Sequence, residues 1–490
     1  MTRQQKHVVV VGGGNAGLCA ALSATEAGAR VTLLERAPVA LRGGNSAFTA
    51  GAMRVAYEGV DDIVSLVPDL TDDQLARTDF GSYDEGAFYD DISRVTRYRA
   101  DPELAQTLVS RSLDTLRWMR EQGVRFIPIY GRQAFQVDGR YTFWGGLTIE
   151  AVGGGPGLVD FLVRAAERRG IDIRYGARAV ALCTGPVGVT GVVVRTGWAE
   201  ETIPADSVVL ASGGFQANTE WRTRYLGPNW DLAKVRGTSY NTGDGIRMAL
   251  DIGASPAGHW SGCHAVQWDH NAPEFGDLKV GDGFQKHSYP FGVVVNADGR
   301  RFLDEGLDFR NYTYAMYGRR VLEQPGQVAW QLFDAKVDHL LRDEYRIRQA
   351  TRFTADTLEG LAAKLEGIDQ AQFLRTITEY NAAVDQSTPF DPNVKDGRST
   401  PGLALPKSNW ANTLDTPPYQ AYAVTCGLTY TFGGLRVDSG ARVLDAEFTP
   451  IPGLFAAGEL VGGLFYFNYP GGSGLTNGAV FGRIAGAAAA

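Results

Sequence analysis

The sequence predicts an α/β fold built around a parallel β-sheet, and three strand-like stretches that run into glycines predict it. The first, "HVVVVGGGNAGLCAALSATEAGARVTLLER" (7–36), has the pattern of a strand, a glycine turn, a helix and a second strand. The other two are "DSVVLASGGF" (206–215) and "IPGLFAAGELVGG" (451–463). A strand, a crossover helix and a second strand form a βαβ unit, whose two strands are parallel.

Composition restricts the class of partner. With 490 residues, 44% of them hydrophobic, the chain can bury a large core and is expected to form two or more domains. The formal net charge of -8 gives no basic surface for nucleic acid or an anionic membrane. Because no signal-peptide pattern and no apolar run of eighteen residues occur, we expect a cytoplasmic protein without membrane insertion. A small molecule is the expected ligand.

The cysteine pattern predicts neither a disulfide framework nor a metal site, because the four cysteines are widely spaced and form no C-x-x-C pair. We therefore expect reduced thiols. The cysteines are Cys19, Cys183, Cys263 and Cys426.

The first βαβ unit has the pattern of a dinucleotide site. Gly12 permits the tight turn, Gly14 lets the backbone approach a pyrophosphate, and Gly17 lets the helix pack against the strand. The phosphates would lie at the helix N-terminus, where free N–H groups and the helix dipole favour anions. Glu35 ends the second strand and is placed to accept both ribose hydroxyls, which favours FAD or NAD over NADP.

Further along the chain, several elements carry no catalytic pattern. Asp101 as a cap, Pro102 in the first turn and Gly123 as a stop predict a helix between them. A pair of amphipathic helices is expected within residues 357–385, followed by a long polar loop over 385–402.

Two later segments, "DSVVLASGGF" and "IPGLFAAGELVGG", favour FAD over NAD, because both resemble segments of flavoproteins with the two-dinucleotide-binding fold. The segment "IPGLFAAGELVGG" resembles the one with which flavoproteins of the two-dinucleotide-binding fold bring backbone N–H groups and an acid, here Gly458 and Glu459, to the ribityl chain and pyrophosphate. The C-terminal "GGSGLTNGAVFGR" resembles the loop and helix N-terminus that meet the pyrimidine edge of the flavin, where N–H groups would stabilise negative charge on reduction.

The order of six motifs along nearly the whole chain matches that of a known protein family. The glycine fingerprint, "RGGNSAFTAGAM", "ASGGF", "NTGDGIRMALDIGA", "VVVNADGRRFLDEG" and "TYTFGGLRVD" follow the order of the fumarate reductase and succinate dehydrogenase flavoprotein family. Within that family, "WRTRYLGPNWDLAKVRGT", "GCHAVQWDHNAPEFGD" and "YFNYPGGSGLTNGAVFGRIAG" resemble the FAD-dependent tricarballylate dehydrogenases. That resemblance implies oxidation of tricarballylate to cis-aconitate, with electrons passed to a membrane-associated iron–sulfur protein.

The resemblance also implies the domain plan: a Rossmann-like FAD domain of residues 1–254 and 427–490, with an inserted α+β capping domain of residues 255–426. Some members of the family attach the flavin to a histidine, but this chain has Asn45 and Ser46 there, so non-covalent FAD is expected. The predicted cofactor-binding residues are Gly12, Gly14, Asn15, Ala16, Gly17, Glu35, Arg36, Gly44, Asn45, Ser46, Ala50, Gly51, Ala179, Val180, Ala211, Ser212, Gly213, Asn241, Gly243, Asp244, Gly458, Glu459, Gly472, Ser473, Gly474, Leu475 and Thr476.

Two residues of the cap match positions that serve catalysis in the family, and a third lies in a segment that departs from the fumarate reductases. Arg310 matches the arginine that handles the proton, and because a guanidinium holds its proton tightly, we interpret it as a relay that is charged at rest. His264 matches a histidine that holds a substrate carboxylate, and His287 is a further candidate.

The sequence departs from the fumarate reductases at two carboxylate-binding positions, where it has Tyr430 and Tyr469. Fumarate and succinate are therefore disfavoured as substrates. Different groups must then recognise the carboxylates, and the candidates are Arg132, Arg140, Lys286 and His287.

A second chemistry is compatible with the same residues. The "YPGG" segment also resembles ketosteroid dehydrogenases, so Tyr469 with the Gly472 or Ser473 N–H could polarise a ketone while Tyr312 or Tyr430 takes its α-proton. The substrate would then be a cyclic or linear ketone, including one that carries a carboxylate. A fumarate-reductase-like ene reductase and a flavin-binding subunit without turnover are two further hypotheses.

Overall fold

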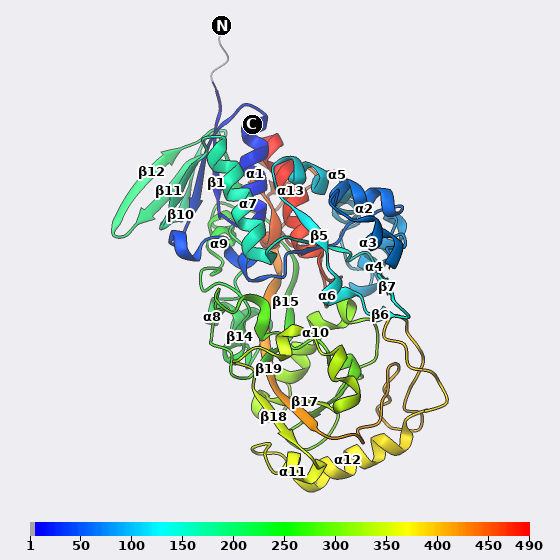
Figure 1. Cartoon of the computed structure of the whole chain (residues 1–490). Helices are drawn as coiled ribbons and strands as arrows, with labels where there is room; N and C mark the ends of the chain where they lie inside the picture. The colour runs from blue at the N-terminus through cyan, green and yellow to red at the C-terminus, as the bar shows by residue number, and fades with distance from the viewer. Residues whose placement is uncertain (1–4) are drawn as a thin grey trace.

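The computed structural model describes residues 5–490. Figure 1 shows an upper part, which contains the C-terminus, and a lower part reached from it by two long strands, β15 (Pro256–Asp269) and β19 (Tyr419–Leu435). Among residues 5–490, no helix is long and apolar enough to cross a membrane.

A six-stranded sheet forms the centre of the upper part, in the order β20-β21-β13-β1-β2-β9. β1 pairs in parallel with β2 and β13, and β13 pairs in parallel with β21. The three stretches singled out in the sequence therefore lie in one sheet, which confirms the α/β prediction. The strands are β1 (His7–Val11), β2 (Arg30–Glu35), β9 (Asp172–Tyr175), β13 (Ser207–Leu210), β20 (Arg442–Leu444) and β21 (Pro450–Ala456).

The C-terminal helix α13 (Ser473–Ala489) packs on α1 (Asn15–Glu26), the helix that follows the glycine turn (Figure 1). A Cβ atom on Gly482 would lie 2.4 Å from the Ala16 carbonyl oxygen, and one on Gly486 would lie 2.1 Å from that of Ala20. Glycine at every fourth position thus lets the two backbones touch. The contact brings the N-termini of both helices together, with Asn15 Nδ2 donating to Leu475 O at 2.7 Å.

The lower part is built on a mixed sheet with the path β14-β19-β17-β16, to which β15 and β18 are added through β19. The predicted domain boundary after residue 254 lies just before β15, whereas the one after Cys426 lies inside β19. One continuous strand thus belongs to both predicted domains. The elements are β14 (Lys234–Val235), β16 (Val293–Asn296), β17 (Ala329–Phe333), β18 (Arg352–Ala355), α10 (Arg310–Leu322), α11 (Leu358–Ala362) and α12 (Gln370–Ala383).

The local predictions agree with the structure. α5 (Pro102–Glu121) has Asp101 as its N-cap, with Oδ1 accepting from Glu103 N and Leu104 N. α11 and α12 are the expected helix pair, and residues 385–402 contain no helix or strand.

The remaining elements surround these two sheets. A three-stranded antiparallel sheet, β10-β11-β12, stands at one side of the upper part in Figure 1. The elements are α2 (Val60–Leu66), α3 (Asp72–Arg77), α4 (Glu85–Val95), α6 (Tyr130–Gln133), α7 (Gly154–Arg168), α8 (Thr219–Trp221), α9 (Asp244–Asp251), β3 (Ala52–Met53), β4 (Thr78–Asp79), β5 (Phe126–Pro128), β6 (Gln136–Val137), β7 (Arg140–Thr142), β8 (Ile149–Ala151), β10 (Ala177–Gly185), β11 (Gly188–Thr196) and β12 (Ala199–Pro204).

Candidate active site

A cavity that is partly open to solvent begins where the carboxyl ends of β1, β2, β13 and β21 meet the N-termini of α1 and α13. It continues to the inner side of the β15–β19 sheet and the first turns of α10. The position at the carboxyl ends of parallel strands is where open α/β sheets bind their ligands. The cavity has one end of glycines and small residues and another of histidine, tyrosine and arginine.

The glycine end fits a dinucleotide. Gly12 has a φ of +110°, and its Cβ would lie 2.4 Å from the Ala211 carbonyl oxygen, so only glycine fits this turn. The Glu35 carboxylate accepts from Gly13 N at 3.0 Å and Ala37 N at 2.7 Å, and it lines the cavity beside the turn. Ser212 Oγ is buried in the lining without a hydrogen-bond partner among residues 5–490, which leaves it available to a ligand.

Glu459 lies at the junction of the two ends. It accepts hydrogen bonds from Thr431 N at 2.9 Å and Gln216 Nε2 at 3.2 Å. Burial raises the pKa of Glu459 to about 7, against the opposing effect of these donors. The carboxyl group is thus held in place, and its contact with the ribityl chain stays a prediction.

Most of the predicted cofactor-binding residues line this cavity, and they come from eight separate stretches of the chain. They are Gly12, Gly14, Asn15, Ala16, Glu35, Arg36, Gly44, Asn45, Ser46, Ala50, Ala179, Ala211, Ser212, Gly213, Asn241, Asp244, Gly458, Glu459, Gly472, Gly474 and Leu475.

The structure places the rest of the predicted cofactor residues behind the lining. Gly17 supports the turn, because its Cβ would lie 1.8 Å from the Gly12 carbonyl oxygen. Thr476 Oγ1 donates to Arg54 O at 2.7 Å, and Ser473 Oγ donates to Pro470 O at 2.6 Å. The Ser473 N–H also donates to Pro470 O, so it is already engaged in a turn. The residues behind the lining are Gly17, Gly51, Val180, Gly243, Ser473 and Thr476.

Two buried histidines face the other end of the cavity. Neither ring nitrogen of His264 has a partner among residues 5–490, while His287 Nδ1 lies 3.0 Å from an Arg310 guanidinium nitrogen. Because a guanidinium can only donate, Nδ1 of His287 is the acceptor, and the proton of the neutral ring is on Nε2. Burial lowers the pKa of both histidines well below 6.5, and the pKa of His287 is lowered further by Arg310. Both rings are therefore neutral at pH 7.

Tyrosines surround His264. Tyr314 OH and Tyr469 OH are 2.8 Å apart, and their ring centroids lie 4.9 Å and 4.7 Å from that of His264. Tyr430 stacks on Tyr469 at 6.2 Å. Burial raises the pKa of all three phenols, so they are neutral hydrogen-bonding groups.

The sequence did not single out Tyr314. It lies four residues after Arg310 on α10, so both side chains share one helix face, whereas Tyr312 points elsewhere. Helical spacing from Arg310 was the signal that could have found it.

Three guanidinium groups line this end of the cavity. Arg132 donates to Asp282 Oδ2 at 3.1 Å, and Arg236 donates to Asp282 Oδ1 at 2.7 Å. Arg310 donates to the Arg132 carbonyl oxygen at 2.9 Å, and among residues 5–490 no carboxylate oxygen lies within 4 Å of its guanidinium. The sequence had proposed Arg132 but neither Arg236 nor Asp282, because their pairing joins segments 46 residues apart.

The remaining two proposed carboxylate ligands lie elsewhere. Lys286 is fully buried, and its Nζ donates to backbone carbonyls such as Glu344 O at 2.9 Å and lies 3.4 Å from Asp269. It thus holds the loop that carries His287. Arg140 is exposed on β7, outside the cavity lining.

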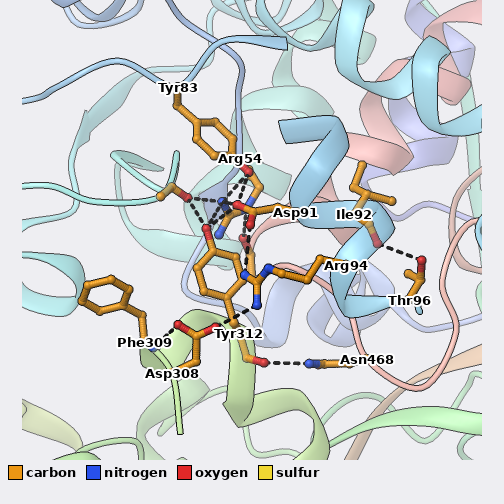
Figure 2. A network of polar contacts seen from close by, with 12 residues as sticks. Arg54, Tyr83, Asp91, Ile92, Arg94, Thr96, Asp308, Phe309, Tyr312 and Asn468 are labelled. Carbon is orange, nitrogen blue, oxygen red and sulfur yellow. Dashed lines mark hydrogen bonds and ion pairs between the residues drawn. The ribbon is translucent and has the colours of Figure 1, made fainter. Parts of the chain in front are cut away.

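Tyr312 belongs to a polar network that joins α10 to α4 (Figure 2). Its hydroxyl donates to Asp91 Oδ2 at 2.5 Å, and Tyr83 OH donates to the same oxygen at 2.7 Å. The fully buried Arg54 donates to Tyr83 OH at 3.0 Å and Tyr312 OH at 3.3 Å, and Arg94 pairs with Asp308 at 2.8 Å. This network fixes the start of α10, from which Arg310 and Tyr314 reach the cavity.

Comparison with known proteins agrees with this geometry. Residues 7–475 match the family described as the FAD binding domain. The chain belongs to this family of FAD-binding flavoproteins. It is 32% identical to a probable fumarate reductase of Shewanella frigidimarina, over 98% of this chain and 74% of that protein. The flavoprotein therefore belongs to the fumarate reductase and succinate dehydrogenase family, which confirms the wider resemblance.

Two further relatives show the range of chemistry on this scaffold. The flavoprotein is 29% identical to a 4-oxocyclohexanecarboxylate 2-dehydrogenase of Sinomonas cyclohexanicum, over 99% of this chain and 94% of that protein. A 3-ketosteroid delta1-dehydrogenase from Sterolibacterium denitrificans shares its fold, with a TM-score of 0.74 and 22% identity over 99% of each chain. The flavoprotein is thus an FAD-dependent oxidoreductase that acts on C=C or CH–CH bonds of small substrates.

The positions of the two tyrosines lead to a prediction. Tyr314→Phe removes a hydroxyl from the cavity and is expected to lower kcat at least about tenfold. Tyr312→Phe removes a hydrogen bond to a carboxylate outside the cavity, so we expect a loss of about 1.5–3 kcal/mol in the free energy of unfolding with kcat within about threefold of the wild type. Chemical denaturation and steady-state rates would measure both. A larger loss of kcat for Tyr312→Phe would contradict this assignment.

Proposed function

We propose that the flavoprotein is a dehydrogenase that oxidises a CH–CH bond of a small polycarboxylate, with tricarballylate, oxidised to cis-aconitate, as the first candidate. The observation that carries the proposal is the charge at the substrate end of the cavity. Arg132, Arg236 and Arg310 line it, with Asp282 as the carboxylate beside them and two neutral histidines. The lining thus has an excess of positive charge, which an anionic substrate would balance.

Arg310 would bind and orient this substrate. A buried guanidinium without a carboxylate is costly, because an uncompensated buried ion loses several kcal/mol of solvation. A substrate carboxylate would supply the missing charge in bidentate geometry. His264, with both ring nitrogens free of partners among residues 5–490, can donate one hydrogen bond and accept another from the same substrate.

Oxidation of a saturated bond also requires a group that removes a proton. Bound FAD supplies the two-electron acceptor for the hydride. Arg310 can move the proton without becoming a neutral base if it passes one N–H proton to His287 Nδ1, 3.0 Å away, as another of its nitrogens takes the substrate proton. Burial lowers the pKa of Arg310, which eases release of its N–H proton. Burial also lowers the pKa of His287, so His287 would carry the proton only in transit.

A ketone that carries a carboxylate is the second candidate. The Tyr314–Tyr469 pair favours it, because hydroxyls 2.8 Å apart can polarise a carbonyl oxygen and share its charge. The relative that oxidises 4-oxocyclohexanecarboxylate has both functional groups in its substrate. A neutral ketone lacks the charge to balance Arg310, so this second candidate requires the carboxylate too.

The proposal also covers the attachment of FAD, the electron acceptor, the cellular location and the direction of the reaction. We expect non-covalent FAD, since Asn45 is held by Thr429 O at 2.7 Å and Thr238 N at 2.9 Å and has no nucleophilic atom. We also propose a membrane-associated iron–sulfur protein as the electron acceptor and a cytoplasmic location. The reverse direction, in which the flavoprotein reduces a C=C bond, stays a further hypothesis.

Anaerobic titration of the purified flavoprotein would test the substrate. We expect tricarballylate to bleach the flavin absorbance, while a 3-ketosteroid and succinate leave it unchanged. A cyclic 4-oxo carboxylate is the discriminating reagent, because bleaching by it and not by tricarballylate would favour the second candidate. Bleaching by the neutral ketosteroid alone would contradict the polycarboxylate function.

A further inference from the structure

Arg236, Asp282 and Arg132 form an ion-pair triad in the wall of the cavity. Arg236 follows β14 and is 7% exposed, Asp282 lies in the 3₁₀ turn Gly281–Phe284, and Arg132 lies on α6. Asp282 Oδ1 accepts from Arg236 at 2.7 Å and its Oδ2 accepts from Arg132 at 3.1 Å. One carboxylate thus holds two guanidinium groups side by side, and the triad keeps one positive charge.

Arg236 retains donors for a ligand. A guanidinium has five N–H groups, and three of those of Arg236 are directed at Asp282 and Thr429. Arg132 uses a single N–H on Asp282 and is 27% exposed at its side chain. Both residues line the cavity, so their remaining N–H groups are available to an anion inside it.

Among residues 5–490, no further carboxylate at the substrate end of the lining supplies the missing negative charge; Glu35, Asp244 and Glu459 line other parts of the cavity. His264, His287, Tyr314 and Tyr469 at the substrate end are neutral, because burial disfavours their charged forms. Burial raises the pKa of Glu150 to about 7 although Arg132 opposes the shift, so its carboxyl group is only partly ionised at neutral pH. Glu344 and Arg342 lie outside the lining of this cavity.

We propose that Arg236 and Arg132, held together by Asp282, form a second carboxylate site that binds an additional carboxylate of the substrate and sets a preference for tricarboxylates over dicarboxylates. This inference rests on the proposed polycarboxylate function. Arg310 is the first site. Arg310 and the triad are linked through the Arg132 carbonyl oxygen, which accepts from Arg310 at 2.9 Å. The two sites are therefore adjacent, as two carboxylates of one small molecule require.

Calorimetric titration of the oxidised holoenzyme tests this site without turnover. The probes are cis-aconitate, with three carboxylates, and glutaconate, with two. In Arg236→Gln, we expect the Kd of cis-aconitate to rise at least about tenfold, while that of glutaconate changes by less than about threefold. An equal rise for both anions, or no change for either, would overturn the second site.

A second variant and a control keep the test decisive. Arg132→Gln, at a partly exposed position, should shift the two dissociation constants in the same unequal way if Arg236→Gln does not fold. Arg140→Gln, at an exposed arginine of β7, should leave both unchanged. If the wild type binds neither anion, the polycarboxylate function itself is contradicted, whereas equal losses in the variants contradict the second site alone.

Discussion

Arg310→Gln is expected to lower kcat by about 10³-fold or more while the protein keeps its full complement of flavin. Arg310 is buried, hydrogen-bonded to His287 and the Arg132 carbonyl, and distant from the glycine end of the cavity. Glutamine keeps hydrogen-bonding capacity but loses both the positive charge and the ability to pass a proton to His287. Rapid-reaction measurement of flavin reduction, with flavin content from absorbance, gives both quantities.

Arg310→Lys separates the two roles of the guanidinium. Lysine restores the charge, so KM should recover toward the wild-type value, but a single ammonium nitrogen cannot both receive a proton and contact His287, so kcat should stay low. Arg320→Gln is the matched control, because Arg320 lies on the same helix and pairs with Glu323 at the surface. A kcat for Arg310→Gln within about tenfold of the wild type would remove Arg310 from the proton transfer.

The parts of the fold that could be predicted are those determined by local pattern. Strands that end in glycine turns, Asp101 as a helix cap and the helix pair near residue 370 depend on neighbours in the sequence, and the structure has all of them. The boundary after Cys426 depends on pairing of β19 with distant strands, and no local signal marks the point at which a continuous strand passes from one region to the other.

In the candidate site, too, the residues set by local motifs could be predicted, and those brought together by tertiary folding could not. The residues at the dinucleotide end come from glycine motifs, and most line the cavity. At the substrate end, Arg236 and Asp282 meet only through tertiary folding, so no spacing in the sequence could reveal them. Tyr312 and Tyr314 are two residues apart on α10, so the helix directs their side chains to different neighbours. The sequence prediction named Tyr312 and missed Tyr314.

The relatives share a scaffold with this flavoprotein. Tyr430 and Tyr469 stand where the fumarate reductases are expected to carry charged carboxylate ligands, and the structure stacks these two rings beside His264. In the function proposed here, the charge for an anionic substrate would come instead from Arg236, Arg132 and Arg310. A change of residue type at a few positions of one cavity would then alter the substrate without altering the fold.

The contact between α1 and α13 leads to the second large effect, because it brings together two helix N-termini that line the cavity. Gly482→Ala adds only a Cβ, which would lie 2.4 Å from the Ala16 carbonyl oxygen, and Gly482→Leu adds a whole side chain at the same point. Alanine is a better helix former than glycine by about 1 kcal/mol, so any loss of stability must come from the contact. We expect a loss of about 1–3 kcal/mol for alanine and more for leucine.

Separation of the two helices should also release the flavin. Asn15 Nδ2 donates to Leu475 O across the contact, and both residues line the cavity, so a shift of α13 displaces groups from both ends of the predicted cofactor site. Flavin content after gel filtration should fall in the order wild type, Gly482→Ala, Gly482→Leu, in parallel with Tm. Gly86→Ala in α4 is the control: Gly86 is exposed, and its added Cβ would lie 3.3 Å from Oδ1 of Asp84, the N-cap of this helix far from the α1–α13 contact, so alanine there should change Tm little and leave the flavin content unchanged. Full flavin content in Gly482→Leu would show that the helix contact is not needed to shape the cofactor site.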